Sequence, residues 1–381
     1  MSGRLLRLVC TATVAAHAVL AAVPAAAAPQ PPAPGKRTVA ELLTDLRRLY
    51  REAERATEAH NATEEKLRKQ RAEVRRLDTA LARARLALQD SRSSAGRLAR
   101  QQYQGSTDIS PYVRLLLARD PQHALEQGHV IGQLARERAK TVAELTGGER
   151  RADELARRAR TALDRQLTLA ARQKKQRDEV RRRLDAVEEM LASLSAEQLA
   201  ALAEFEKNGI AKAQQEFLAS GALSSAQKPT QEGDRALRYA VRQLGKPYEW
   251  GAEGPKSFDC SGLTSQAWAK AGTTIPRTSQ EQWARLKRIP MSALRPGDLV
   301  VYFPQATHVA MYLGDGMVVQ APRPGAKVKV SPIAANPILG AVRPDPGGEP
   351  LRRYAPPKLP KGAMDGSDEG YASAAPPTSA R

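Results

Sequence analysis

A long helical seam between Thr38 and Gly105 constrains the fold more than any other feature of the sequence. Leu, Ala or Val recurs there at intervals of three, four and multiples of seven, and charged residues fill the gaps. This spacing is typical of a coiled coil. A single helix of about 65 residues would extend roughly 100 Å, so it needs a partner along its length. The seam positions are 42, 46, 49, 53, 56, 67, 74, 77, 81, 84, 88, 95 and 98.

The partner helix is expected later in the same chain. Helical rhythm stops near Gly105, passes two X-Pro breaks and resumes from about Ala124 to Ala219. The break at 105–123 is long enough to reverse the chain, which favours an antiparallel hairpin over pairing with a second chain. Polar residues that interrupt the seam, His60 among them, are interpreted as positions that fix the register of the helices.

Residues 1–28 have the three parts of a secretory signal peptide, namely early arginines, an apolar run and a small-residue stretch. An uncleaved leader that anchors the chain in a membrane is the alternative, although Pro24 ends the apolar run. A Pro-rich linker follows at 29–37. The formal net charge is +19, which outside the cytoplasm suggests wall polymers or lipid head groups, and not nucleic acid, as anionic partners.

A sequence pattern typical of a globular domain appears only in the C-terminal part of the chain. After a helical domain at 38–219 and a linker at 220–230, residues 231–345 combine helices with short apolar strands, which predicts an α+β domain. Residues 346–381 are rich in Pro, Gly, Ser and Ala and predict a disordered tail. The expected helices are 234–244, 260–271 and 279–286, and the expected strands are 299–303, 308–313, 317–320 and 326–330.

Cys260 is the only cysteine outside the leader, so an exported chain could not use it for an internal disulfide. It would be a buried passenger, an intermolecular link or a reactive group. At the start of a predicted helix its thiolate would be stabilised by the helix N-terminus. His308 begins a strand and could act as the base, and Gln320, at the end of the next strand, could orient the imidazole. The backbone N–H groups at the helix start could stabilise an oxyanion.

The ordered motifs of residues 229–345 resemble the NlpC/P60 family of cell-wall cysteine peptidases. Ala252 and Ala310 replace glycines that are common in the family, and Gln320 is one of several polar residues it tolerates. The matching motifs are Gly245-Lys-Pro-Tyr248-Glu-Trp250-Gly251, Gly254-Pro255, Phe258-Asp-Cys260-Ser-Gly-Leu263, Pro276-Arg277-Thr278-Ser279, Arg295-Pro-Gly-Asp298-Leu299 and His308-Val-Ala-Met-Tyr-Leu-Gly314.

The resemblance implies a papain-like α+β catalytic domain, here preceded by a long coiled-coil hairpin. It implies catalysis by Cys260, His308 and Gln320 without metal or organic cofactor, and assigns three further residues to the substrate. Tyr248 would line the site, and Asp259 and Ser261 would help to bind the peptide or amine end.

The implied reaction is hydrolysis of a peptidoglycan stem peptide, typically between D-isoglutamate and the diamino acid, by a secreted, wall-associated enzyme. Relatives with a coiled coil are similar to division-associated wall hydrolases, so residues 38–219 are expected either to cover the cleft or to dock on a membrane partner. Two other functions stay open. One is a related thiol amidase that cuts between the sugar and the first alanine, and the other is a non-enzymatic scaffold that activates another hydrolase.

Overall fold

The computed structural model describes residues 37–104, 113, 116, 120–223 and 227–366. The predicted signal peptide, almost all of the Pro-rich linker, much of the predicted reversal at 105–123 and residues 367–381 lie outside the described residues. In the part of the chain that the structure describes, no helix combines the length and the apolar character that crossing a membrane requires.

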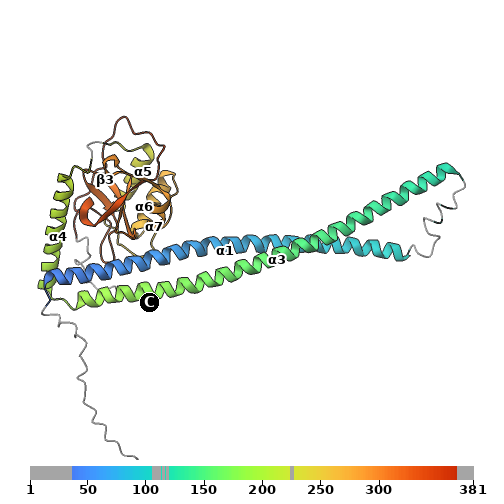
Figure 1. The fold of residues 1–381 in the computed structure, drawn as a ribbon, viewed down its shortest axis with the longest axis horizontal. Coiled ribbons are helices and arrows are strands. Elements are labelled where there is room, and N and C mark those ends of the chain that lie inside the picture. The colour runs from blue at the N-terminus through green and yellow to red at the C-terminus, as the bar shows by residue number, and fades with distance from the viewer. Residues whose placement is uncertain (1–36, 105–112, 114–115, 117–119, 224–226, 367–381) are drawn as a thin grey trace, which may run out of the picture. The chain divides into compact units, whose positions relative to one another are not determined.

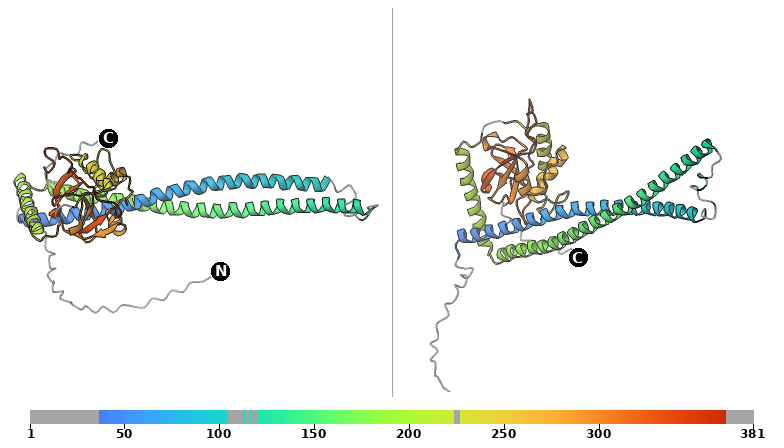
Figure 2. Two further views of the ribbon diagram at one scale, coloured as in Figure 1. Left: turned by 90° about the horizontal axis from the view of Figure 1, so that it is seen from above. Right: turned by 45° about the vertical axis from the view of Figure 1, so that its right-hand side comes forward.

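Two long helices, α1 (Val39–Gln104) and α3 (Pro121–Ala192), run side by side in opposite directions (Figures 1 and 2). Seam residues of α1 meet small residues of α3, as where Val74 and Leu77 pack with Ala159 and Ala162. The small alanine side chains allow the helix axes to approach closely. The predicted hairpin is therefore confirmed, and the helices pair within one chain.

The second helical stretch is not continuous. It ends at Ala192, and a new helix, α4 (Ala196–Ala219), begins after Ser195, whose side chain forms a capping box with Gln198. Near its other end, the Gln214 side chain donates to the Gly316 carbonyl at 2.9 Å and accepts from the Ala334 N–H at 3.1 Å. Helix α4 is thus fixed to the C-terminal domain by its own contacts.

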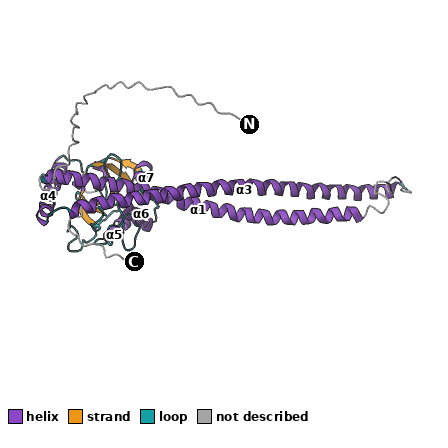
Figure 3. Cartoon of the chain, turned by 90° about the horizontal axis from the view of Figure 1, so that it is seen from below, coloured by secondary structure: helices purple, strands orange, loops and turns teal. Residues whose placement is uncertain are grey.

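The C-terminal domain combines three helices with one antiparallel sheet in the order β1-β6-β2-β3-β4-β5. Figure 3 distinguishes the helices from the strands by colour. The helices are α5 (Gln231–Val241), α6 (Cys260–Ala271) and α7 (Ser279–Arg285). The strands are β1 (Lys287–Ile289), β2 (Leu299–Tyr302), β3 (His308–Gly314), β4 (Met317–Gln320), β5 (Lys329–Pro332) and β6 (Ile338–Arg343).

Both faces of the sheet are buried because side chains alternate along each strand. On one face, Leu299 and Val301 join a core that includes Trp268 of α6. On the other face, Val300 and Tyr302 belong to a second core, against which Phe217 of α4 packs. The predicted α+β class is confirmed, and the sheet is held between α5 and α6 on one side and part of α4 on the other.

Three details differ from the sequence-based expectation. Strands β1 and β6 were not predicted, since β1 is three residues long and polar and β6 contains a glycine. The strand expected at 326–330 begins in the ladder only at Lys329, because the backbone of Val328 bonds instead to Lys246 and Gly245. Gly245 and Lys246 lie outside the strands of the sheet, so apolar alternation in the sequence does not predict that they bond to Val328.

The prediction of a disordered tail needs correction for residues 346–366. The N–H of Leu351 donates to the Pro229 carbonyl at 2.8 Å, and the Val330 N–H donates to the Ala363 carbonyl at 2.8 Å. Hydrogen bonds to the backbone depend little on side-chain type, so a Pro- and Gly-rich composition did not reveal them. The segment up to residue 366 lies against the C-terminal domain.

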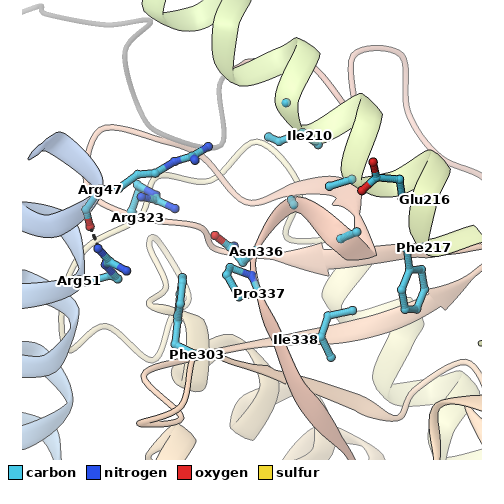
Figure 4. A pocket seen from close by; sticks show the side chains of 14 residues that line it. Arg47, Arg51, Ile210, Glu216, Phe217, Phe303, Arg323, Asn336, Pro337 and Ile338 are labelled. Carbon is cyan, nitrogen blue, oxygen red and sulfur yellow. Dashed lines mark hydrogen bonds between the residues drawn. The ribbon is translucent and has the colours of Figure 1, made fainter. Parts of the chain in front are cut away.

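A cavity lies between α1, α4 and the C-terminal domain (Figure 4). Arg47 and Arg51 line it from α1, and Phe217 lines it from α4. None of the predicted site residues lines it. The guanidinium of Arg323, also in the lining, stacks over the ring of Tyr50 at 4.8 Å. Helix α1 thus borders the cavity and contacts the C-terminal domain at its edge through Tyr50. Further polar contacts between α1 and that domain follow one to three turns along the helix.

Candidate active site

Cys260 is the first residue of α6. The carboxylate of Asp259, the N-cap residue, accepts the backbone N–H of Gly262 at 2.6 Å. A Cβ at residue 262 would lie 2.2 Å from the Ala252 carbonyl oxygen, so only glycine lets the helix start pack against that loop. The thiol is buried, and the backbone N–H of Val309 hydrogen-bonds to it. The sulfur thus lies at a helix N-terminus and against the start of β3.

His308 and Gln320 are directly connected. The imidazole Nε2 of His308 lies 2.7 Å from Oε1 of Gln320, and Nε2 of Gln320 donates to the Ser331 hydroxyl at 2.8 Å. With its amide nitrogen on Ser331, Gln320 presents an acceptor to the imidazole, so Nε2 of His308 carries the proton. The other ring nitrogen, Nδ1, is then the one suited to act as a base.

One face of α1 covers the start of α6. Oε1 of Glu58 accepts the Ser261 hydroxyl at 2.8 Å and lies 3.8 Å from the sulfur of Cys260. Its other oxygen accepts the backbone N–H of Ser279 at 3.0 Å. A carboxylate from the helical hairpin therefore occupies the space directly beside the thiol.

Two further α1 side chains extend this contact. Oε1 of Glu54 lies 3.6 Å from Nδ1 of His308, and Asn61 donates to Asp259 at 3.0 Å. Glu54, Glu58 and Asn61 are four and three residues apart and so share one helix face. The carboxyl groups of Glu54 and Glu58, one turn apart on α1, therefore reach His308 and Cys260 from the same helix face.

Helix α1 also makes an aromatic contact with the C-terminal domain. The imidazole of His60 meets the indole of Trp250 with ring centroids 5.0 Å apart and planes at 83°. The neighbouring Gly251 lies close to Asn61, since a Cβ at residue 251 would be 3.5 Å from the Asn61 side-chain oxygen. We refer to Glu54, Glu58, His60 and Asn61 together as the α1 plug. All four are buried.

Charge in the site is balanced mainly by Arg277. Its guanidinium donates to both oxygens of Asp259, at 2.7 and 3.1 Å, and to the hydroxyl of Ser261 at 2.9 Å. It also donates to Glu253 at 2.8 Å. A buried carboxylate needs such a partner, and Arg277 supplies it for Asp259 at the start of α6.

The covered site disfavours the thiolate form of Cys260. Burial, followed by the nearby Glu58 and Asp259 carboxylates, raises the pKa of Cys260. Burial, followed by Asp259, raises the pKa of Glu58 to about 7, although Arg277 opposes this. In this closed arrangement, burial and the neighbouring carboxylates oppose the thiolate that the sequence predicts at the helix N-terminus.

The three predicted substrate residues are all buried near Cys260. Tyr248 packs in the same apolar cluster as Cys260, and burial raises the pKa of its phenol. Asp259 and Ser261 are engaged by Asn61 and Glu58 of the plug. Two of the three residues that the resemblance assigned to substrate, Asp259 and Ser261, are thus occupied by side chains of α1.

Sequence reasoning missed the plug. The coiled-coil seam has no apolar position between Ala56 and Leu67, and the plug residues Glu58, His60 and Asn61 lie in that interval. This interruption of the apolar seam over three helical turns was the available signal, but His60 was interpreted as a position that fixes the register of the helices. Ser331, which orients Gln320, gave no signal because it only becomes adjacent through strand pairing.

No group of three or more His, Cys, Asp or Glu side chains in the described ranges is arranged to hold a metal ion. The described site contains the thiol of Cys260, the imidazole of His308 and the amide of Gln320. Together with the fold, these groups define an α+β domain of the papain-like class, with a cysteine at a helix N-terminus beside a histidine on a sheet.

Comparison with known proteins agrees with this class. Residues 245–340 match the model of the NlpC/P60 family, which identifies this part of the chain as an NlpC/P60 family domain. A probable endopeptidase of Corynebacterium glutamicum is 39% identical over 125 residues, which are 33% of this chain and 59% of the relative. The chain thus matches little more than half the length of that relative, over one third of its own length.

Two solved structures are similar to the same domain. The NlpC/p60 domain of the peptidoglycan hydrolase SagA is 32% identical and covers 29% of this chain and 97% of its own, with a TM-score of 0.28. RipD from Mycobacterium tuberculosis, described as a non-catalytic NlpC/p60 protein adapted to peptidoglycan binding, is 32% identical. It covers 30% of this chain and 98% of its own, with a TM-score of 0.28.

Proposed function

We propose that this chain is a secreted peptidoglycan endopeptidase that cleaves stem peptides between D-isoglutamate and the diamino acid. Cys260 is its nucleophile, His308 its base and Gln320 the residue that orients the base. The observation that carries the proposal is the contact series from Ser331 through Gln320 to His308, with the thiol of Cys260 held beside the same strand.

The carboxylate of Glu58 supports the choice of bond. The site beside the sulfur accepts a carboxylate through the Ser279 N–H and the Ser261 hydroxyl. D-Isoglutamate linked through its side chain keeps a free α-carboxylate, which could replace that of Glu58 when the plug leaves. A stem peptide with this residue at the acyl position would then place its γ-carbonyl near Cys260.

Once the plug leaves, the thiol proton passes to Nδ1 of His308, and the thiolate attacks the γ-carbonyl carbon. The backbone N–H of Cys260 stabilises the oxyanion. His308 then gives its proton to the departing amine of the diamino acid, leaving a thioester on Cys260. A water molecule gives a proton to His308 and attacks the thioester, which releases the new carboxylate and restores the thiol.

The plug supplies the regulation in this proposal. With Glu58 against Cys260 and Asn61 against Asp259, substrate cannot reach the nucleophile while α1 is in place. Activity therefore requires that α1 and the catalytic domain separate. A membrane partner at the division site that binds the helical hairpin would provide the trigger, and peptidoglycan would be the substrate at the wall.

The test uses a full-length opened variant, Asn61→Trp, whose bulky side chain has no room beside Gly251. The control is Ala59→Trp, at an exposed position of the same helix turn. Purified wall is digested, and the fragments are identified by mass spectrometry. We expect fragments ending in isoglutamate from the opened variant and little release from the wild-type chain or the control. Equal release by the wild-type chain and the opened variant would rule out restraint by α1.

The same digestion separates the other functions. Release of sugar chains from the first alanine would show an amidase. The opened variant is also compared with and without Cys260→Ala in the presence of another hydrolase. If both proteins support wall degradation equally, then the chain is a scaffold and the enzymatic proposal fails.

A further inference from the structure

The contact between His60 and Trp250 is not needed to block the nucleophile. Glu58 and Glu54 already contact the thiol and the imidazole, yet α1 also covers Trp250 with an aromatic side chain. Trp250 is only partly buried even with the plug in place, and it packs at the edge of the main core. Departure of α1 would expose more of its indole beside the active site.

The order of contacts along α1 shows which end of a substrate Trp250 would face. Glu54 contacts His308, Glu58 contacts the thiol, and the next turn contacts Asp259 and Trp250. From Glu54 to Asn61, seven residues, α1 rises about 10 Å. The His308 end is the leaving-group end, because His308 protonates the departing amine. Trp250 therefore lies at the acyl end, beyond the position of isoglutamate.

We propose that Trp250 is a platform for the sugar to which the stem peptide is attached, and hence that the enzyme prefers sugar-linked stem peptides to free peptides. This inference rests on the proposed function. In a stem peptide the acyl residue is followed by the first alanine and then by the sugar. With isoglutamate at Cys260 and the alanine N–H near Asp259, the sugar reaches the region that His60 covers in the closed chain.

The chemistry of the two surfaces matches. An indole offers a large flat apolar face, and a pyranose ring presents a row of C–H groups with partial positive charge on one of its faces. His60 occupies that region with its ring nearly perpendicular to the indole. Burial lowers the pKa of His60, so an uncharged ring covers Trp250. An uncharged sugar ring can take its place without requiring a new charge partner.

The test compares two substrates on the opened, full-length chain. One is muramyl tripeptide, and the other is the same tripeptide with N-acetylated alanine, which keeps the amide N–H but lacks the sugar. We expect kcat/KM to be about tenfold higher for the muramyl substrate, equivalent to about 1.4 kcal/mol. Trp250→Ala should remove this ratio while keeping activity on the acetylated peptide, and Trp250→Phe should reduce it. Phe205→Ala, which removes an exposed aromatic side chain of α4, should leave the ratio unchanged.

A ratio near one for the opened variant, or an unchanged ratio in Trp250→Ala, overturns the platform. If Trp250→Ala loses activity on both substrates, the kcat/KM ratio of the Trp250→Phe variant is used instead. An undiminished ratio in that variant would also contradict the proposal. Failure of the proposed function is distinct, because the opened variant would then cleave neither substrate at the isoglutamyl bond.

Discussion

Glu58 makes closure of the active site depend on pH. In the closed chain its carboxyl is buried against Cys260, Ser261 and Ser279, with Asp259 adding negative charge nearby and Arg277 opposing it. In the open chain the same carboxyl is on an exposed helix face. Its pKa is about 7 when closed and has the ordinary value of 4.5 when exposed.

The sign follows from which state binds the proton more tightly. A pKa that is raised on closure means that closure is strongest below pH 4.5 and weakens as pH rises toward 7. The difference of about 2.5 pH units corresponds to about 3 kcal/mol. Between pH 5 and pH 8 the ratio of open to closed chains should rise on the order of 50- to 100-fold. The Cys260 thiol, whose pKa burial also raises, adds to the same trend at higher pH.

Alkylation of Cys260 by iodoacetamide measures the open fraction. The rate for the wild-type chain is divided, at each pH, by the rate for the opened variant, which cancels the titration of the exposed thiol. We expect this quotient to rise steeply from pH 5 to pH 8. In Glu58→Gln, which resembles the protonated carboxyl, it should stay low and nearly flat. A flat wild-type quotient, or the same rise in Glu58→Gln, would refute the electrostatic account of closure.

Two other substitutions test the site itself. Gln320→Glu in the opened variant should keep activity and move the alkaline limb of the kcat/KM profile to higher pH, because a carboxylate stabilises the imidazolium of His308; a folded but inactive protein would count against this role. Arg277→Met leaves Asp259 buried without its cation and should lower the free energy of unfolding by about 3–5 kcal/mol in urea titrations, whereas the exposed Arg285→Met should change it little. Equal losses in both variants would show that Arg277 does not stabilise Asp259.

Local sequence signals predicted the elements that depend on local periodicity. The start of α6 at Cys260 and the extent of β4 agree with the prediction, because a cap residue and apolar alternation are encoded within a few positions. The break at Ser193 was missed, although Ser195 and Gln198 carry a capping box, because helical periodicity continues on both sides. Strands such as β1 and β6, whose backbone hydrogen bonds go to distant segments, were not indicated by the local sequence pattern.

The candidate site divides in the same way. The cysteine motif and the strand-borne histidine carried enough signal for Cys260, His308 and Gln320 to be singled out. The plug could not be predicted in the same manner, since Glu58 and Ser261 are 203 residues apart and their contact depends on how α1 packs against the catalytic domain. A polar interval in a coiled coil is compatible with many roles, and only the opposing surface distinguishes them.

Closure by carboxylates has a consequence that a purely steric cover would lack. While Glu54 and Glu58 lie beside the site, their charge and the loss of water keep the proton on the Cys260 thiol. When α1 leaves, the same thiol remains at the N-terminus of α6, where the helix dipole and the neighbouring imidazole favour the thiolate. Under the proposed function, opening is therefore expected both to expose Cys260 and to favour its thiolate. An α1 that is displaced only far enough to admit substrate, with Glu58 still near the sulfur, would leave the enzyme slow, so full separation is expected to be the productive state.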